Sequence, residues 1–141
     1  MIIPWLSAPA ELVLIRQFRP PAEGYVIEFP AGLIDEGESE QEAAVRELYE
    51  ETGFHGSVNK IIPPTFNTPG LSGETVYHVF MEIDRNNAKN INPRPAFDEG
   101  EHIETCLVQK PDIKTFLEKE ISAGSMFDSK VMAYLQGLIS L

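Results

Sequence analysis

The chain has 141 residues, which suits one compact domain with a single hydrophobic core. Hydrophobic residues make up 43% and aromatic residues 9%, so a disordered chain is not expected. The formal net charge of −11, from 22 acidic and 11 basic residues, argues against a nucleic-acid-binding protein, whose surface would carry a basic patch.

The first half of the chain alternates strands and turns before one long helix. IIPWL and ELVLIRQF predict two strands joined by the turn SAPA, and YVIEF predicts a third after the turn PPAEG. In the helix that follows, Ser39 and Glu42 form a capping-box pattern at the start. Gly53 is a typical left-handed stop at its end, and Ala44 and Leu48 lie on an apolar side.

The second half predicts further strands, one long loop and two helices. SVNKIIPPTF, TVYHVFMEI and EHIETCLVQ read as strands, the last of them the final strand of the chain. Residues 85–100 are the longest irregular stretch; such loops are often functional lids, and a disordered excursion is nearly as common. The apolar stripes of the two helices are Ile113, Phe116, Leu117 and Ile121, then Phe127, Val131, Leu135 and Leu138. This order predicts an α+β fold, a mixed β-sheet sandwiched between α-helices, in a single domain spanning 1–141.

The long helix places Glu47, Glu50 and Glu51 on one side, although like charges three and four residues apart destabilise a helix by about 0.2–0.5 kcal/mol per pair. A divalent cation that prefers oxygen ligands would turn this repulsion into attraction. Arg46 is expected to pair with a carboxylate and hold it in one orientation. A solvated acidic face is the simpler alternative, and the length of the surrounding pattern favours the metal site.

That surrounding pattern resembles the Nudix box, which is Gly, five residues, Glu, seven residues, then Arg-Glu-aliphatic-x-Glu-Glu-x-Gly-apolar. Every fixed position is matched, by Gly32, Glu38, Arg46, Glu47, Leu48, Glu50, Glu51, Gly53 and Phe54. The stretches QFRPPAEGYVIEFPAGLIDEGE and TPGLS are similar to the ADP-sugar (ADP-ribose) pyrophosphatase branch of that family. The proline that marks this branch corresponds to Pro69, and the likeness extends from about Leu12 to Leu107.

The resemblance implies roles for individual residues. Glu47, Glu51 and the carbonyl of Ala31 would hold Mg²⁺, with Mn²⁺ as an alternative ion, and Glu50 would be a further ligand or position a water molecule. The base acting on the attacking water would be Glu101, with Glu99 and Glu104 as alternatives. Arg46 would support the catalytic carboxylates. Arg19 would contact a substrate phosphate, and Leu33 would line the pocket.

The activity that the resemblance implies is hydrolysis of the diphosphate bond of ADP-ribose and related nucleotide sugars, giving AMP and ribose 5-phosphate. One alternative is hydrolysis of oxidised nucleoside diphosphates. Another is a nucleotide-binding module without turnover. Family members carry a longer N-terminal region whose strands join a homodimer, and this sequence begins close to the first core strand. The resemblance implies a homodimer, whereas the short N-terminal region leads us to expect that the strands that would form it are not included.

Compartment and partners are inferred from what the sequence lacks. Cys106 is the only cysteine, so an internal disulfide is excluded and an intracellular setting is favoured. The N-terminal segment MIIPWLSAPA lacks the features of a signal peptide, and no apolar stretch is long enough for a bilayer span. We expect a cytoplasmic protein, with the nucleus as the alternative, that binds a small-molecule nucleotide sugar and neither nucleic acid nor membrane.

Overall fold

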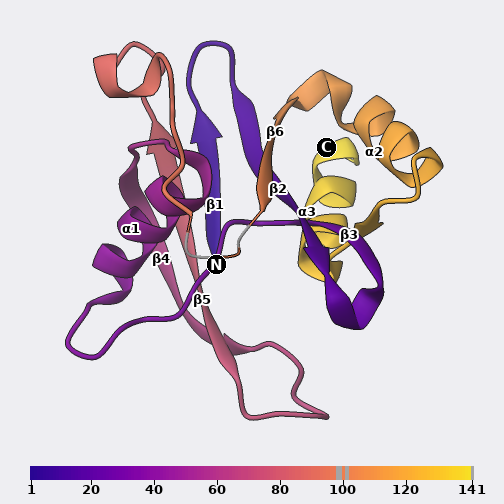
Figure 1. The fold of residues 1–141 in the computed structure, drawn as a ribbon, viewed down its shortest axis with the longest axis horizontal. Coiled ribbons are helices and arrows are strands. Elements are labelled where there is room, and N and C mark those ends of the chain that lie inside the picture. Colours follow the sequence, from indigo (N-terminus) through magenta and orange to yellow (C-terminus); the bar gives the residue numbers. More distant parts are fainter. Residues whose placement is uncertain (98–99, 101, 141) are drawn as a thin grey trace.

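The computed structural model describes residues 1–97, 100 and 102–140. Within these residues a mixed β-sheet has the strand order β4-β5-β1-β2-β3-β7, and β6 also pairs with β2. Helix α1 covers one face of the sheet, and helices α2 and α3 cover the other (Figure 1). The predicted α+β fold with a mixed sheet between helices is confirmed.

The strands match the sequence prediction closely, apart from one short addition near the C-terminus. They are β1 (Ile2–Leu6), β2 (Glu11–Arg19), β3 (Gly24–Glu28), β4 (Ser57–Phe66), β5 (Thr75–Ile83), β6 (Ile103–Gln109) and β7 (Met126–Phe127). The pairs β1–β5 and β3–β7 are parallel, and the other pairs are antiparallel. The helices are α1 (Glu40–Thr52), α2 (Ile113–Ser122) and α3 (Ser129–Ile139).

Strand β2 organises the core because both of its faces are buried. Leu12 and Leu14 belong to the cluster that packs against α2 and α3, whereas Val13 belongs to the cluster that packs against α1. This arrangement follows from the alternation of side chains along a strand. The apolar run at the start of β2 therefore serves two cores, as expected of an interior strand.

Helix α1 begins and ends at the residues that the sequence predicts. The Ser39 side chain accepts a hydrogen bond from the Glu42 backbone, and the Glu42 side chain accepts one from the Ser39 backbone, which completes the capping box. Gly53 ends the helix with a left-handed φ of 74°. Ala44 and Leu48 are buried against the sheet, which fixes the helix so that Glu47 borders a pocket while Glu51 is buried beside it.

Two details of the C-terminal region differ from the prediction. Phe127 lies in β7 beside Ile27 of β3, ahead of the helix, because Asp128 caps the helix that follows. Ile121 was expected on the buried stripe of α2, but its side chain is 57% exposed. Among the helices of the described residues, none combines the length and the apolar character needed to cross a membrane.

Candidate active site

Arg46, in the middle of α1, is the centre of a hydrogen-bond network that joins the helix to the loop before it. Its guanidinium donates to both oxygens of Glu38, at 2.9 Å and 2.8 Å. The same group donates to Glu47 Oε1 at 2.7 Å, to Glu50 Oε2 at 3.0 Å and to the carbonyl of Leu33 at 3.0 Å. The prediction that Arg46 holds a carboxylate in one orientation is confirmed, and the network extends to the loop that precedes the helix.

Glu38 is a structural partner of Arg46, and its charge state reflects that role. Hydrogen bonds from Arg46, with a smaller contribution from the backbone N–H of Asp35, lower the pKa of Glu38 to about 2. Glu38 is therefore ionised over the whole neutral range. Its negative charge balances the guanidinium, and this pairing fixes the loop against the helix.

The backbone after β3 lies directly against the acidic side of α1. The Ala31 N–H donates to Glu51 Oε2 at 3.0 Å, and Glu51 is only 5% exposed. At the next residue, a Cβ on Gly32 would overlap the Glu47 carboxylate. A side chain at this position would therefore displace the Glu47 carboxylate from its place beside the backbone. These contacts bring together Ala31, Glu47 and Glu51, three of the four predicted metal-binding residues; the fourth is Glu50.

The expected convergence of Glu47, Glu50 and Glu51 on a single point is not seen. Within the described part of the chain, no three acidic, histidine or cysteine side chains are gathered closely enough to hold a metal ion. The physical reason is that Arg46 draws Glu47 and Glu50 toward its Nη1, whereas Glu51 is buried against the Ala31 backbone. The donor set nevertheless fits a divalent cation such as Mg²⁺, because it consists of carboxylate and carbonyl oxygens.

A pocket of about 630 Å³ opens beside this network. The predicted substrate-binding residues Arg19 and Leu33 both line it, together with Glu47, Ala31 and Gly32. The Arg19 guanidinium also forms an ion pair with Glu28 at 2.8 Å, which holds it at the end of β2. The pocket therefore brings Arg19, the predicted phosphate contact, to the same cavity as two predicted metal-binding residues, Glu47 and Ala31.

The pocket has a second wall that the sequence analysis did not assign to the site. It comes from β5 and the residue before it, with the members Glu74, Thr75, Val76, Tyr77 and Val79. Tyr77, Val79 and Met81 alternate along the sequence of β5 and all belong to or pack against the core cluster that includes α1, but nothing local to the strand shows that α1 lies across from it. The side of α1 that faces this wall contributes Glu40, Ala43 and Ala44.

The three candidates for the base have different positions. Glu101 and Glu99 lie outside the described residues. Glu104 pairs with Arg16 across β2 and β6, and its Oε2 accepts a hydrogen bond from Arg16 Nε at 3.0 Å. Arg16 also approaches Glu120 of α2 to 3.9 Å, so Glu104 points to the face of the sheet opposite α1. This position argues against Glu104 as the base.

The loop that leads to Glu99 and Glu101 is fixed to the C-terminal end of α1. The Ala96 N–H donates to the carbonyl of Glu50 at 2.9 Å. The buried Asn90 side chain bonds the backbone of His55 and the carbonyl of Asp84. In its described portion, the long loop at residues 85–100 is thus attached to the rest of the molecule through Asn90 and Ala96.

The protein has an α+β fold with a mixed sheet between helices, and a glutamate-rich helix borders its pocket. These features together define the class of protein to which the chain can be compared. The family model described as the NUDIX domain matches residues 2–128. The chain belongs to this family. Its members generally use divalent metal ions.

Individual relatives narrow the comparison. The chain is 41% identical over 124 residues to an ADP-sugar pyrophosphatase of Mus musculus, covering 87% of this chain and 57% of the relative. It is 38% identical over 131 residues to an ADP-ribose pyrophosphatase of Saccharomyces cerevisiae, covering 93% of this chain and 57% of that relative. A crystal structure of an ADP compounds hydrolase matches with a TM-score of 0.56 and 26% identity, over 83% of this chain and 60% of that one. The chain spans just over half the length of the two curated relatives.

Proposed function

We propose that this protein hydrolyses the diphosphate bond of ADP-ribose and related nucleotide sugars in a Mg²⁺-dependent reaction. The observation that carries the proposal is the contact of Glu47, Glu51 and the Ala31–Gly32 backbone at the edge of a pocket that Arg19 also lines. Relatives named for ADP-ribose and ADP-sugar pyrophosphatase activity support the substrate class. The homodimer and the cytoplasmic location stay predictions.

In this proposal each part of the site has one task. Arg19 binds a phosphate oxygen, and Leu33 covers the substrate at the mouth of the pocket. Glu47, Glu51 and the Ala31 carbonyl would hold Mg²⁺, with Glu50 as a further ligand once it is released from Arg46. Such an ion neutralises charge on the diphosphate oxygens. Glu101 would orient the attacking water, and the products would be AMP and ribose 5-phosphate.

The direct test is a product-resolved assay on ADP-ribose, other nucleotide sugars and oxidised nucleoside diphosphates, with and without Mg²⁺. We expect AMP and ribose 5-phosphate from ADP-ribose only when Mg²⁺ is present. Preferred turnover of the oxidised nucleotides would replace the proposal with the nucleotide-sanitising alternative. Binding of ADP-ribose without cleavage would identify a nucleotide-binding module.

A single substitution tests the part that Glu51 plays. Glu51→Gln keeps the size of the side chain and its acceptor for the Ala31 N–H, but it removes the charge that a cation needs. We expect kcat to fall by at least about 100-fold, on the order of the loss of one transition-state-stabilising group. An unchanged circular dichroism spectrum is the control for folding. A near-normal rate in this variant would remove Glu51 from the mechanism.

A further inference from the structure

The long loop after β5 contains one buried side chain. Of residues 84–97, all of which the structure describes, only Asn90 is buried, at 4% exposed. Its Nδ2 donates to the carbonyls of His55 and Asp84, both at 2.9 Å, and its Oδ1 accepts from the His55 N–H at 2.8 Å. The amide therefore satisfies three backbone groups at once, and both of its donor hydrogens are used.

These backbone groups belong to the ends of two elements that form the pocket. His55 follows α1, the helix that carries Glu47 and Glu51. Asp84 follows β5, which forms the second wall of the pocket. Asn90 thus joins both elements to the loop at one buried point. Because buried polar groups without partners are costly, this point has a single favoured arrangement.

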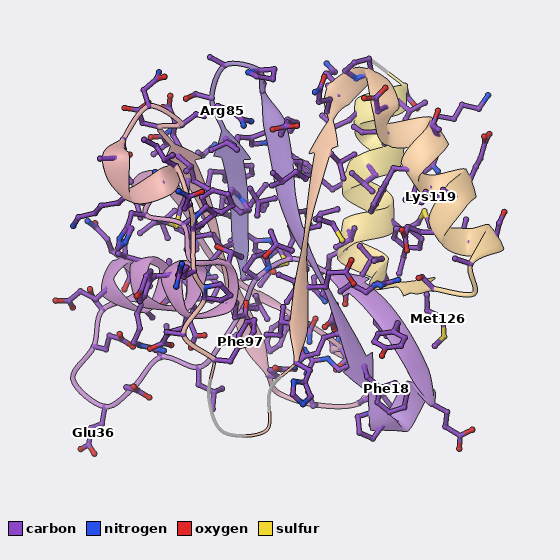
Figure 2. The ribbon with its side chains drawn as sticks, turned by 45° about the horizontal axis from the view of Figure 1, so that its top comes forward. Phe18, Glu36, Arg85, Phe97, Lys119 and Met126 are labelled. Carbon is purple, nitrogen blue, oxygen red and sulfur yellow. The ribbon has the colours of Figure 1, made fainter. Side chains whose placement is uncertain are left out.

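Beyond Asn90 the loop has little freedom as far as Ala96. Two prolines in this segment fix φ at their positions, and its backbone packs against Gly53. The Ala96 N–H donates to the carbonyl of Glu50 at 2.9 Å, one of the carbonyls that the end of α1 leaves without a partner inside the helix. In Figure 2 the segment ends at Phe97, beside α1. The position set at Asn90 is therefore carried along the loop to the helix end.

We infer that Asn90 is a positioning residue for turnover, because it fixes the loop against the ends of α1 and β5. This inference rests on the proposed function, in which a glutamate two or four positions after Phe97 in the sequence acts on the attacking water. Of the described residues 84–97, none lines the pocket. Asn90 therefore acts on the rate of the reaction and not on the binding of the ligand.

Kinetics and binding measured together test this role. In Asn90→Ala the carbonyls of His55 and Asp84 lose their donor, so the loop is free to shift. Since a displacement of about 1 Å can lower a rate by about 100-fold, we expect kcat for ADP-ribose to fall at least about tenfold. The dissociation constant for ADP-ribose, measured by calorimetry with Ca²⁺ to limit turnover, should stay within about twofold. Asn90→Asp keeps the shape and the acceptor but lacks the two donors, and it provides the same test if the alanine variant does not fold.

Two further variants control for effects unrelated to the position of the loop. Asn87→Ala removes an exposed asparagine of the same loop, whose Oδ1 accepts from the Lys89 N–H at 3.0 Å within its own turn. Leu135→Val weakens the core on the sheet face opposite α1, and it controls for a general loss of stability. Both variants should keep kcat within about twofold of wild type.

Hydrogen exchange reports the position of the loop without any reaction. The Ala96 N–H should exchange at least about tenfold faster in Asn90→Ala than in wild type, because its bond to the Glu50 carbonyl depends on the fixed loop. The Ala43 N–H bonds the Ser39 carbonyl in the first turn of α1 and should exchange at the wild-type rate. Faster exchange at Ala96 alone would support a local displacement of the loop.

The outcomes separate this inference from the proposed function. With an active wild-type protein, a kcat of the Asn90 variants within about twofold of wild type overturns the inference and leaves the proposed function intact. Unchanged exchange at Ala96 also overturns it, as does an equal fall of kcat in Leu135→Val. A wild-type protein that binds ADP-ribose but does not cleave it with Mg²⁺ contradicts the proposed function before any variant is made. Exchange at Ala96 then decides alone whether Asn90 positions the loop.

Discussion

At the scale of the residue, Arg46 explains how several carboxylates coexist on one side of α1. Glu38, Glu47 and Glu50 all accept hydrogen bonds from its guanidinium. Their mutual repulsion is offset by a shared cation, so the acidic side is stable before any metal binds. The same guanidinium bonds the Leu33 carbonyl, which connects the helix to a pocket-lining loop. Arg46 is therefore a positioning residue for both the predicted metal ligands and the loop.

Arg46→Lys tests this positioning role. Lysine keeps the positive charge but lacks the planar fork that contacts three carboxylates and a carbonyl at once. We expect kcat for ADP-ribose to fall at least about tenfold, the equivalent of about 1.4 kcal/mol in the activation free energy. Steady-state kinetics at saturating Mg²⁺ provide the measurement.

Arg85→Lys is the matched control for that experiment. Arg85 forms an ion pair with Glu11 and bonds the Ser7 carbonyl, and Figure 2 places it far from the loop that carries Glu36. The control should keep a normal kcat. A normal kcat in Arg46→Lys as well would show that charge alone, without the fork, supports the site.

At the scale of the element, the end of α1 controls how the following loop is placed. Gly53 has φ of +74°, and a Cβ there would overlap the Arg94 backbone. Gly37, in the loop before the helix, has φ of +86° with open space around it. A side chain at either glycine would introduce similar backbone strain, because both have positive φ. Only at Gly53 would the side chain also collide with neighbouring atoms.

The comparison of Gly53→Ala with Gly37→Ala separates strain from packing. Gly37→Ala should lower the free energy of unfolding by about 1 kcal/mol, the cost of a left-handed alanine. Gly53→Ala should cost a further 1–3 kcal/mol or so, because the Arg94 segment must move. It should also reduce turnover, since this segment continues toward Glu99 and Glu101. Urea unfolding gives the free energies, and equal losses in the two variants would contradict the packing argument.

Helix α1 and strand β7 differ in whether nearby or distant residues of the sequence determine them. The limits of α1 could be predicted because Ser39, Glu42 and Gly53 act within one turn of the helix ends. Strand β7 could not, because its two residues are defined by pairing with β3, about a hundred positions earlier. Within the site, the sequence pattern identified Arg46, Glu47 and Glu51. It could not show that Glu104 faces away from them or that Glu74 lines the pocket, because both facts depend on the pairing of distant strands.

At the scale of the whole molecule, a net charge of −11 has consequences for stability and for binding. Self-repulsion of this size destabilises the folded state, and salt screens it over about 8–10 Å at moderate ionic strength. Sodium chloride should therefore raise the melting temperature without any specific site. A cation that binds between Glu47 and Glu51 should raise it further, because it binds the folded state alone.

Thermal unfolding in MgCl₂ and in NaCl at equal ionic strength distinguishes the two effects. We expect a larger stabilisation in MgCl₂, with an excess of about 2.7 kcal/mol at a Mg²⁺ concentration 100 times the dissociation constant. In the double variant Glu47→Gln, Glu51→Gln this excess should disappear, while the response to NaCl remains because the molecule stays strongly acidic. If wild type and variant respond to MgCl₂ equally, the ion acts only by screening, and the acidic side of α1 is a solvated surface rather than a metal site.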